Sequence, residues 1–470
     1  MPREIFKHAL NHLGVVAVSK LVPIASLLIY SQYLAPEEFG VISLFFSYMW
    51  LIGIALTLNL HTAIGRYIYD GNFYDGELIG TTIIPLTILF IIGFFAVLTN
   101  QQWFSTLLNL PASTLAFLLF ATIGQISESL LLQIKTARKQ SGELLNALAL
   151  RSISSIALTI TLFYVLTTKK YMAVLISEAI VSVLLTLFLF SVLARDRPWS
   201  FSARTLRLFI LYSVPLIPYM LSLTLLTQFD RIMIDRLYGK EATGLYSVGF
   251  NLGMMVVLGA SGLLNALNPR FFSAMDAMDV SQIKIDANAI LSFCAYCTVL
   301  LALLGPLAAS LLMPVSYEDG FKLIPLIAAA GLASIVFQIW GRVIAYNKKT
   351  YQLSLVAVGA TAIKIGLNMA LLPTFDLWGA AMATLLAYCF MAGVTVSILN
   401  QNVTSLEIGL GRPAIWMGCV LVIVAVDLYK MPCYSLEIAL RASIFCFASI
   451  FMWINLRPFK NRRLIERAKG

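Results

Sequence analysis

Residues 33–43 read YLAPEEFGVIS and residues 237–247 read LYGKEATGLYS, two related segments separated by an offset of 204 residues. Another stretch repeats farther along the chain at an offset of 213 residues. Single identities arise by chance in so biased a composition, but these matches keep the same order along the chain. The matched pairs are Glu37 with Glu241, Gly40 with Gly244, Ser43 with Ser247, Arg66 with Arg270, Gln125 with Gln338, Ile126 with Ile339, Lys135 with Lys348, and Arg151 with Lys364. The sequence therefore predicts an internal duplication.

The apolar runs around these segments predict an all-α polytopic membrane protein. The 470 residues are 60% hydrophobic and only 12% charged, against roughly 25% charged residues in soluble domains, which excludes a water-soluble enzyme. A bilayer core needs about 20 apolar residues per helix. Fourteen runs meet this requirement: 9–34, 39–64, 79–99, 112–134, 144–167, 172–194, 208–234, 245–268, 287–313, 322–346, 350–372, 377–399, 414–432 and 435–456.

Each repeat offset corresponds to six predicted spans. Because six is an even number, the two copies share one orientation and are expected to be related by an axis along the membrane normal. We expect an N-terminal lobe of helices 1–6 in residues 1–200 and a C-terminal lobe of helices 7–12 in residues 201–400. Residues 401–470 add helices 13 and 14 and a basic cytoplasmic tail. Parallel lobes of this kind suit alternating access, and the other interpretation is a relic of duplication in a structural protein.

The distribution of basic residues predicts the orientation. One side of the predicted topology collects 22 Lys and Arg residues and the opposite side six, and short loops retain basic residues in the cytoplasm. Both termini are therefore expected in the cytoplasm. The net charge of +10 follows from this topology and from attraction to anionic lipid, so nucleic acid is not needed as a partner.

Three cations lie deep inside predicted spans. Lys20, Arg151 and Lys364 are about 16, 11 and 21 Å from the cytoplasmic ends of their spans at 1.5 Å per residue. Each costs at least roughly 2.5 to 3.5 kcal/mol near the bilayer centre unless it faces water or a partner. We expect them to line a cationic cavity for an anionic substrate, because Arg and Lys both bind phosphate.

Two buried acids offer another interpretation. Glu128 and Glu178 also lie inside spans and could neutralise the cations in ion pairs that only lock helices together. They are equally candidates for binding the H+ or Na+ that drives transport. No other cofactor is expected.

Predicted helix 7 contains residues typical of a hinge or a gate. Pro215 and Pro218 interrupt its hydrogen-bond ladder and predict a hinge. Asp230 and Arg231 come near its outer end, where they would form either a surface ion pair or a gate between the lobes.

Signatures of metal sites and catalysis are missing from the sequence. Cys294 and Cys297 have the spacing of a zinc ligand pair, but the chain has no second pair and only three histidines, so we interpret them as packing residues. No phosphate-binding glycine loop and no nucleophile elbow occur. We therefore expect neither a metal site nor an enzyme.

Two stretches resemble a known family. Residues 20–70, KLVPIASLLIYSQYLAPEEFGVISLFFSYMWLIGIALTLNLHTAIGRYIYD, and residues 212–255, YSVPLIPYMLSLTLLTQFDRIMIDRLYGKEATGLYSVGFNLGMM, are similar to O-antigen flippases, the Wzx-type polysaccharide transporters. These belong to the MOP exporter superfamily, which also contains MATE-type multidrug exporters and the lipid II flippase. The resemblance covers helices 1 to 12, and the extra pair of helices departs from the commoner 12-span form.

The resemblance implies translocation of an undecaprenyl diphosphate-linked oligosaccharide, an O-antigen or other surface polysaccharide unit, to the outer face of a bacterial inner membrane. It also implies contact with inner-membrane lipids and with a polysaccharide polymerase and its chain-length machinery. Three alternatives stay open: a MATE-type cation antiporter, a lipid II flippase, and a membrane polymerase or ligase. The first usually has an acid in helix 1, whereas this chain has none between Glu4 and Glu37.

Overall fold

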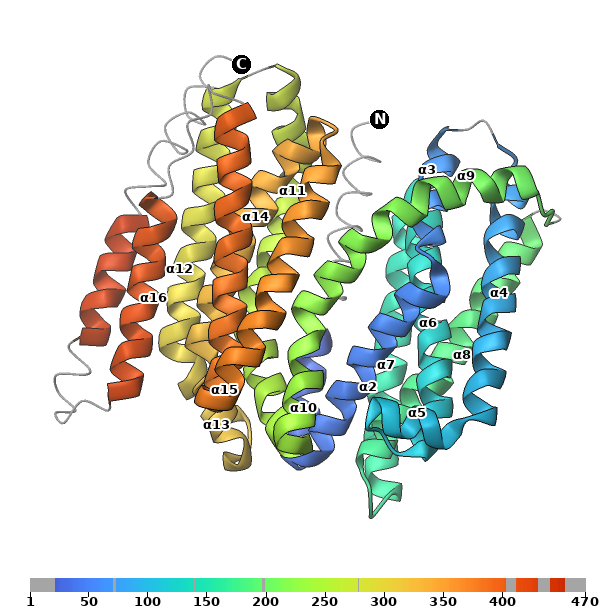
Figure 1. Ribbon diagram of the computed structural model, residues 1–470, viewed down its shortest axis with the longest axis horizontal. Coiled ribbons are helices and arrows are strands. Elements are labelled where there is room, and N and C mark those ends of the chain that lie inside the picture. Colours follow the sequence, from blue (N-terminus) through green and yellow to red (C-terminus); the bar gives the residue numbers. More distant parts are fainter. Residues whose placement is uncertain are drawn as a thin grey trace. The chain divides into compact units, whose positions relative to one another are not determined.

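The computed structural model describes residues 22–70, 73–138, 140–196, 199–277, 279–402, 411–429 and 440–452. Within these ranges every regular element is a helix (Figure 1). The all-α fold class predicted from the apolar runs is therefore confirmed. By its internal packing the chain divides into two compact units, one ending at Gly244 and the other beginning at Leu245. The assignment of residues 1–200 and 201–400 to two repeated lobes stays a prediction.

The first unit is built around α6, which packs against α2, α3, α4, α7 and α8. Its core joins Ile64, Leu78, Leu131, Leu185 and Phe209, all buried. Its elements are the helix Val22–Ser31, α2 Pro36–Thr57, α3 Leu60–Asp70, α4 Asp75–Thr99, α5 Gln101–Leu108, α6 Ala112–Ala137, α7 Ser141–Val165, α8 Tyr171–Asp196, α9 Ala203–Ser213, the 3-10 turn η1 Val214–Leu216, and the part of α10 Ile217–Gly253 that precedes Leu245.

The second unit is built around α14, which is almost wholly buried and packs against α11, α12, α15 and α16. Its remaining elements are the end of α10, α11 Met255–Asp276, α12 Val280–Leu312, the 3-10 turn η2 Val315–Tyr317, α13 Glu318–Phe321, α14 Ile324–Tyr346, α15 Thr350–Asn402, α16 Gly411–Tyr429 and the helix Leu440–Met452.

Nine helices in the described residues are long and apolar enough to cross a membrane, and three shorter ones are also apolar. Two of the nine contain a sharp kink. Gly239 in α10 has φ 84° and ψ −173°, and Asp376 in α15 has φ 49° and ψ −135°. The multi-span architecture is thus confirmed, while the number of 14 spans stays a prediction.

Two predicted spans are broken in the structure. The span 39–64 divides into α2 and α3 because Leu58 and Asn59 have φ of 45° and 59°, which ends a right-handed helix. The span 208–234 divides into α9 and α10 at η1, where Pro215 lies. The loop between α4 and α6 also holds a helix, α5, that the hydropathy pattern does not indicate because it is only eight residues long.

Candidate functional site

Three neighbouring helices of the first unit bring Glu128, Arg151 and Glu178 together, and we call these residues the Arg151 triad. Arg151 on α7 donates a hydrogen bond from Nη2 to Glu178 Oε1 on α8. Its Nη1 lies 3.3 Å from Glu128 Oε2 on α6. Ser155, one turn along α7, donates from its hydroxyl to the other oxygen of Glu178 over 3.4 Å. The pairing that the sequence offers as an alternative is therefore what the structure shows for Arg151.

The triad lies halfway along its helices. Arg151 is ten positions after Ser141, the start of α7, and fourteen before its end at Val165. At 1.5 Å per residue these distances are about 15 and 21 Å, so Arg151 is near the centre of a bilayer core about 30 Å thick. A long side chain cannot reach the interface from there, which explains why partners are needed.

The charges and exposure of the triad are unequal. Two carboxylates share one guanidinium, which leaves a formal charge of −1. Side-chain exposure is 9% for Glu178, 18% for Arg151 and 33% for Glu128, so only Glu128 is substantially open. The Arg151 Nε is buried and has no hydrogen-bond partner among the described residues. The triad thus has one unused donor and one accessible carboxylate.

Aromatic residues in and just after the first described helix pack two to three turns along α7 from Arg151. Tyr30 donates from its hydroxyl to Thr159 Oγ1 over 3.3 Å, and Tyr33 stacks on Phe163 with ring centroids 4.8 Å apart. Tyr30 is buried. The sequence does not predict these contacts, because nothing in the spacing of Tyr30 and Tyr33 indicates which helix they face. The contacts become evident only when the helices are arranged in space.

Of the other two predicted cations, only Lys364 lies in the described residues. Lys364 is on α15 in the second unit, with an exposure of 1%, and its Nζ is 6.0 Å from the ring centroid of Phe250. That distance is at the outer limit of a cation–π contact. Lys20 lies outside the described residues. A single cavity lined by Lys20, Arg151 and Lys364 therefore stays a prediction.

The predicted gate residues Asp230 and Arg231 lie in α10 and are both buried, so they do not form a surface ion pair. Arg231 Nη1 donates to the carbonyl of Thr227 at 2.7 Å and to Gln228 Oε1 at 2.8 Å. The same Gln228 oxygen accepts a hydrogen bond from Ser47 on α2 at 3.0 Å. These contacts tie α10 to α2 within the first unit, and a role as a gate stays a prediction.

The predicted hinge coincides with an irregular backbone. Pro215 lies inside η1, and Pro218 is the second residue of α10. Proline lacks the N–H that would continue the helical ladder, which accounts for the tight turn between α9 and α10. Movement at this position stays a prediction.

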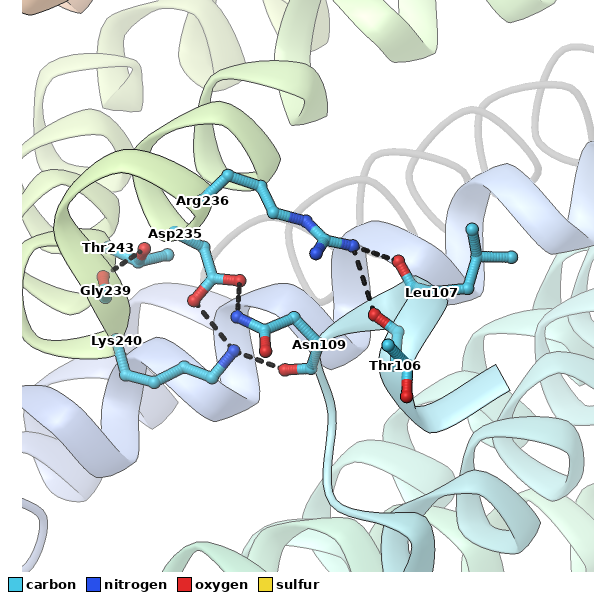
Figure 2. Close-up of polar contacts among 8 residues, drawn as sticks. All are labelled: Thr106, Leu107, Asn109, Asp235, Arg236, Gly239, Lys240 and Thr243. Carbon is cyan, nitrogen blue, oxygen red and sulfur yellow. Dashed lines mark hydrogen bonds and ion pairs between the residues drawn. The ribbon is translucent and has the colours of Figure 1, made fainter. Parts of the chain in front are cut away.

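A polar cluster around the kink of α10 was missed by sequence reasoning, and we call it the α5–α10 clamp (Figure 2). Asp235 accepts hydrogen bonds from Lys240 Nζ at 2.7 Å and from Asn109 Nδ2 at 2.8 Å. Lys240 also donates to the carbonyl of Asn109, and Arg236 donates to the carbonyls of Thr106 and Leu107. The signal available in the sequence is the group of charges on either side of Gly239, but their partner on α5 is more than a hundred residues away.

Metal ligands are not gathered anywhere in the described ranges, where no group of three His, Cys, Asp or Glu residues could hold an ion. Cys294 and Cys297 are free thiols on α12, and Cys294 is buried in the core of the second unit.

Solved structures with a similar fold are those of membrane transporters. The lipid II flippase MurJ in an inward closed conformation matches with a TM-score of 0.70 and 11% identity, covering 97% of this chain and 99% of that one. The MATE multidrug transporter DinF-BH matches with a TM-score of 0.64 and 15% identity, covering 87% and 97%. At these identities the likeness shows the fold alone, one shared with transporters that the sequence resembles.

Sequence comparison gives the family. A protein of the Lsg locus of Haemophilus influenzae is 25% identical over 299 residues, which cover 62% of this chain and 71% of that protein. Residues 5–275, more than half of the chain, match the family described as polysaccharide biosynthesis protein. The chain therefore belongs to the polysaccharide biosynthesis protein family.

Proposed function

We propose that this protein flips an undecaprenyl diphosphate-linked oligosaccharide across a bacterial inner membrane by alternating access, with both termini in the cytoplasm. Family membership and the transporter fold support the class of function. The observation that carries the substrate assignment is Arg151, a guanidinium in the middle of a membrane-spanning helix. The sugar units would feed a membrane polymerase and its chain-length machinery.

In this proposal the diphosphate replaces the carboxylates on Arg151. Without substrate, Glu178 and Glu128 compensate the guanidinium, which avoids an unpaired cation in a region of low dielectric. A diphosphate offers the same pair of acceptor oxygens to the planar guanidinium fork and carries more charge. The exchange thus lets one cation serve both the empty and the loaded protein.

The same exchange would couple transport to an ion gradient. Once Arg151 is held by the diphosphate, Glu128 and Glu178 lose their compensating charge, and two carboxylates in one site cannot both stay ionised without a partner. They would then bind H+ or Na+, and the accessible Glu128 is the entry point. After the substrate has left, return of Arg151 to the carboxylates in the cytoplasm-facing state would release the ion, so that the ion moves inward as the substrate moves outward.

The test uses purified full-length protein in liposomes with a fluorescent undecaprenyl diphosphate oligosaccharide in one leaflet. Wild-type protein should move the lipid across the bilayer, faster with an imposed proton or Na+ gradient, and Arg151→Gln should not. Movement by Arg151→Gln at the wild-type rate would contradict the role of Arg151, and no movement by the wild type would contradict the proposed function.

The lipid II flippase is the second candidate, because the fold likeness to that protein extends over 97% of this chain. Its substrate has the same lipid diphosphate, so Arg151 does not separate the two candidates. Complementation does: the gene should restore surface polysaccharide in a strain without its own exporter and should not sustain growth of a strain depleted of the lipid II flippase.

A further inference from the structure

Residues 199–207, which we call the α4 strap, are fastened to the start of α4. Ser202 donates a hydrogen bond from its backbone N–H to Thr81 Oγ1 over 3.1 Å, and the hydroxyl of Thr205 donates to the carboxylate of Glu77. The strap runs into α9, which packs against α3 and α4 (Figure 1). These contacts hold the strap at the end of α4 that the basic residues place in the cytoplasm.

The outer face of α9 carries two arginines. Thr205 and Phe209 are buried, whereas Arg204, Arg207 and Leu211 are exposed. Positions 204, 207 and 211 are three and four residues apart, so their side chains share one face of the helix. Within the described part of the chain neither arginine forms an ion pair. Both guanidinium groups can therefore bind an anion from outside the chain.

The acids at the start of α4 are engaged by other residues. Asp75 forms an ion pair of 2.9 Å with Arg138 at the end of α6, and Glu77 accepts the hydrogen bond from Thr205. The two strap arginines therefore leave this end of α4 electropositive, which favours a negatively charged ligand.

An apolar pocket lies farther along α4, between α4, α6 and α8. It has an empty volume of about 390 Å³ including its open side, within the range of roughly 300 to 1,000 Å³ that is typical of ligand sites. Its lining includes Ile83 and Phe90 on α4, Ile126 and Leu130 on α6, and Leu189 and Phe190 on α8.

The chemistry of this lining suits a hydrocarbon chain. Only two hydroxyl groups belong to it, those of Thr87 and Ser127. Ser127 is buried and is hydrogen-bonded to Thr186 Oγ1 at 3.0 Å, and Thr87 lies at the exposed edge. A sugar or a phosphate in the pocket would lose its hydration without gaining partners, whereas an acyl chain loses nothing.

The strap and the pocket lie at the depths of a lipid headgroup and its chains. The predicted span starts at residue 79, and the strap is bound to Glu77 and Thr81, within about 3 Å of that depth at 1.5 Å per residue. The pocket extends from Ile83 to Phe90, about 6 to 17 Å beyond it. Since the polar region of one leaflet is about 5 to 8 Å thick, the arginines are level with phosphates and the pocket with acyl chains.

Trp199 joins the strap to the pocket. Its indole N–H donates to the carbonyl of Leu193 on α8 over 3.1 Å, and its ring centroid is 5.6 Å from that of Phe190, which lines the pocket. Gly80 allows the strap to approach α4 closely, because a Cβ there would lie 2.5 Å from the carbonyl oxygen of Ser200. The arginines are thus brought to the cytoplasmic end of the pocket, where one ligand can reach both.

We propose that the α4 strap and this pocket bind one anionic phospholipid of the cytoplasmic leaflet, with its phosphate at Arg204 and Arg207 and an acyl chain in the pocket. Charge complementarity selects the headgroup, because guanidinium groups bind phosphate and this leaflet is anionic. The lipid braces the start of α4, a span that is buried far less than α6. The site does not depend on the proposed function, and only its leaflet depends on the predicted orientation.

The first experiment tests the headgroup by native mass spectrometry of the purified full-length protein. The protein is titrated with phosphatidylglycerol and with phosphatidylcholine of the same acyl chains. Arg204→Gln with Arg207→Gln should weaken binding of phosphatidylglycerol by roughly thirty-fold, about five-fold for each arginine, and should leave phosphatidylcholine unchanged. The matched control is Lys348→Gln with Lys349→Gln, which removes the same charge on the predicted cytoplasmic side of the second unit and should bind phosphatidylglycerol as the wild type does.

The second experiment tests the pocket with a substitution at its exposed edge. Thr87→Trp fills the space for the chain and should weaken binding of both phospholipids to a similar extent. The control is Ile88→Trp on the same helix, because Ile88 is exposed but does not line the pocket. Thermal unfolding without added lipid checks that both variants fold. Phosphatidylglycerol binding that survives either the arginine pair of substitutions or Thr87→Trp unchanged would overturn the site.

A competition experiment separates a resident phospholipid from the lipid-linked substrate. Undecaprenyl diphosphate added at equal concentration should leave phosphatidylglycerol on the wild-type protein, and its displacement would assign the site to the substrate and overturn the proposal. If the binding results are as expected while the liposome assay detects no movement of the oligosaccharide, the phospholipid site stands and the proposed function fails.

Discussion

Arg151 and Glu178 lie 27 positions apart on adjacent antiparallel helices, and the guanidinium of one donates directly to the carboxylate of the other. Only 9% of the Glu178 side chain is exposed, and Glu128 provides the second contact of Arg151 from α6. The residues do not simply cancel, because two acids share one base. This imbalance separates the triad from an ordinary helix lock and makes its structural and functional roles experimentally separable.

Arg151→Ala should destabilise the first unit and stop export, whereas Arg151→Ala with Glu178→Gln should recover stability but not export. Removing one partner of a buried pair costs about 3 kcal/mol because the opposite charge is left uncompensated, and the Gln substitution removes the more buried of the two carboxylates left behind. Thermal unfolding in detergent measures the first effect and surface polysaccharide the second. Export by the double variant would mean that the triad only holds helices together.

Lys364→Met should abolish export while the protein still inserts and folds. Met has a similar length and keeps the packing around this enclosed side chain, so the substitution removes mainly the charge. The control is Lys322→Met, which removes an exposed lysine paired with Asp319 outside the spans. Equal export by the two variants would remove Lys364 from the substrate path.

Much of the fold could be predicted because a bilayer constrains sequence so strongly. The run 112–134 corresponds to α6, and 144–167 to α7, within three residues at each end. Hydropathy does not report local backbone geometry. The apolar runs therefore predict continuous spans where the structure has breaks at Leu58 and Pro215.

The candidate site could be predicted only in part, for a different reason. Arg151 and its two acids stand out because charges are expensive in membranes, and they do converge. Which carboxylate faces which cation depends on helix rotation, so pairing and substrate binding could not be separated. Asn109 and Asp235 lie outside the predicted spans, where polar residues are ordinary, and nothing in their spacing links them.

The predicted orientation gives opposite accessibility to the two ends of α14. Lys322 precedes this helix and Lys348 follows it, and both are exposed. Since the basic residues place the end near Lys348 in the cytoplasm, an impermeant thiol reagent added outside should label Lys322→Cys and not Lys348→Cys. Permeabilised cells, in which both should react, provide the control. The reverse pattern would invert the predicted topology.

Gly124→Ala should destabilise the first unit, because α6 and α8 pack there without space for a side chain. A Cβ on Gly124 would lie 2.2 Å from the Cβ and 2.7 Å from the Cα of Ser182. Overpacking of this kind costs about 1 to 3 kcal/mol, and here it would also disturb the helices that carry Glu128 and Glu178. The matched control is Gly259→Ala on α11, where a Cβ would have no atom within 4 Å and the better helix propensity of alanine favours folding by up to about 1 kcal/mol. The midpoints of thermal unfolding of the two variants in detergent should therefore shift in opposite directions. An unchanged midpoint for Gly124→Ala would show that α6 and α8 can move apart without loss of stability.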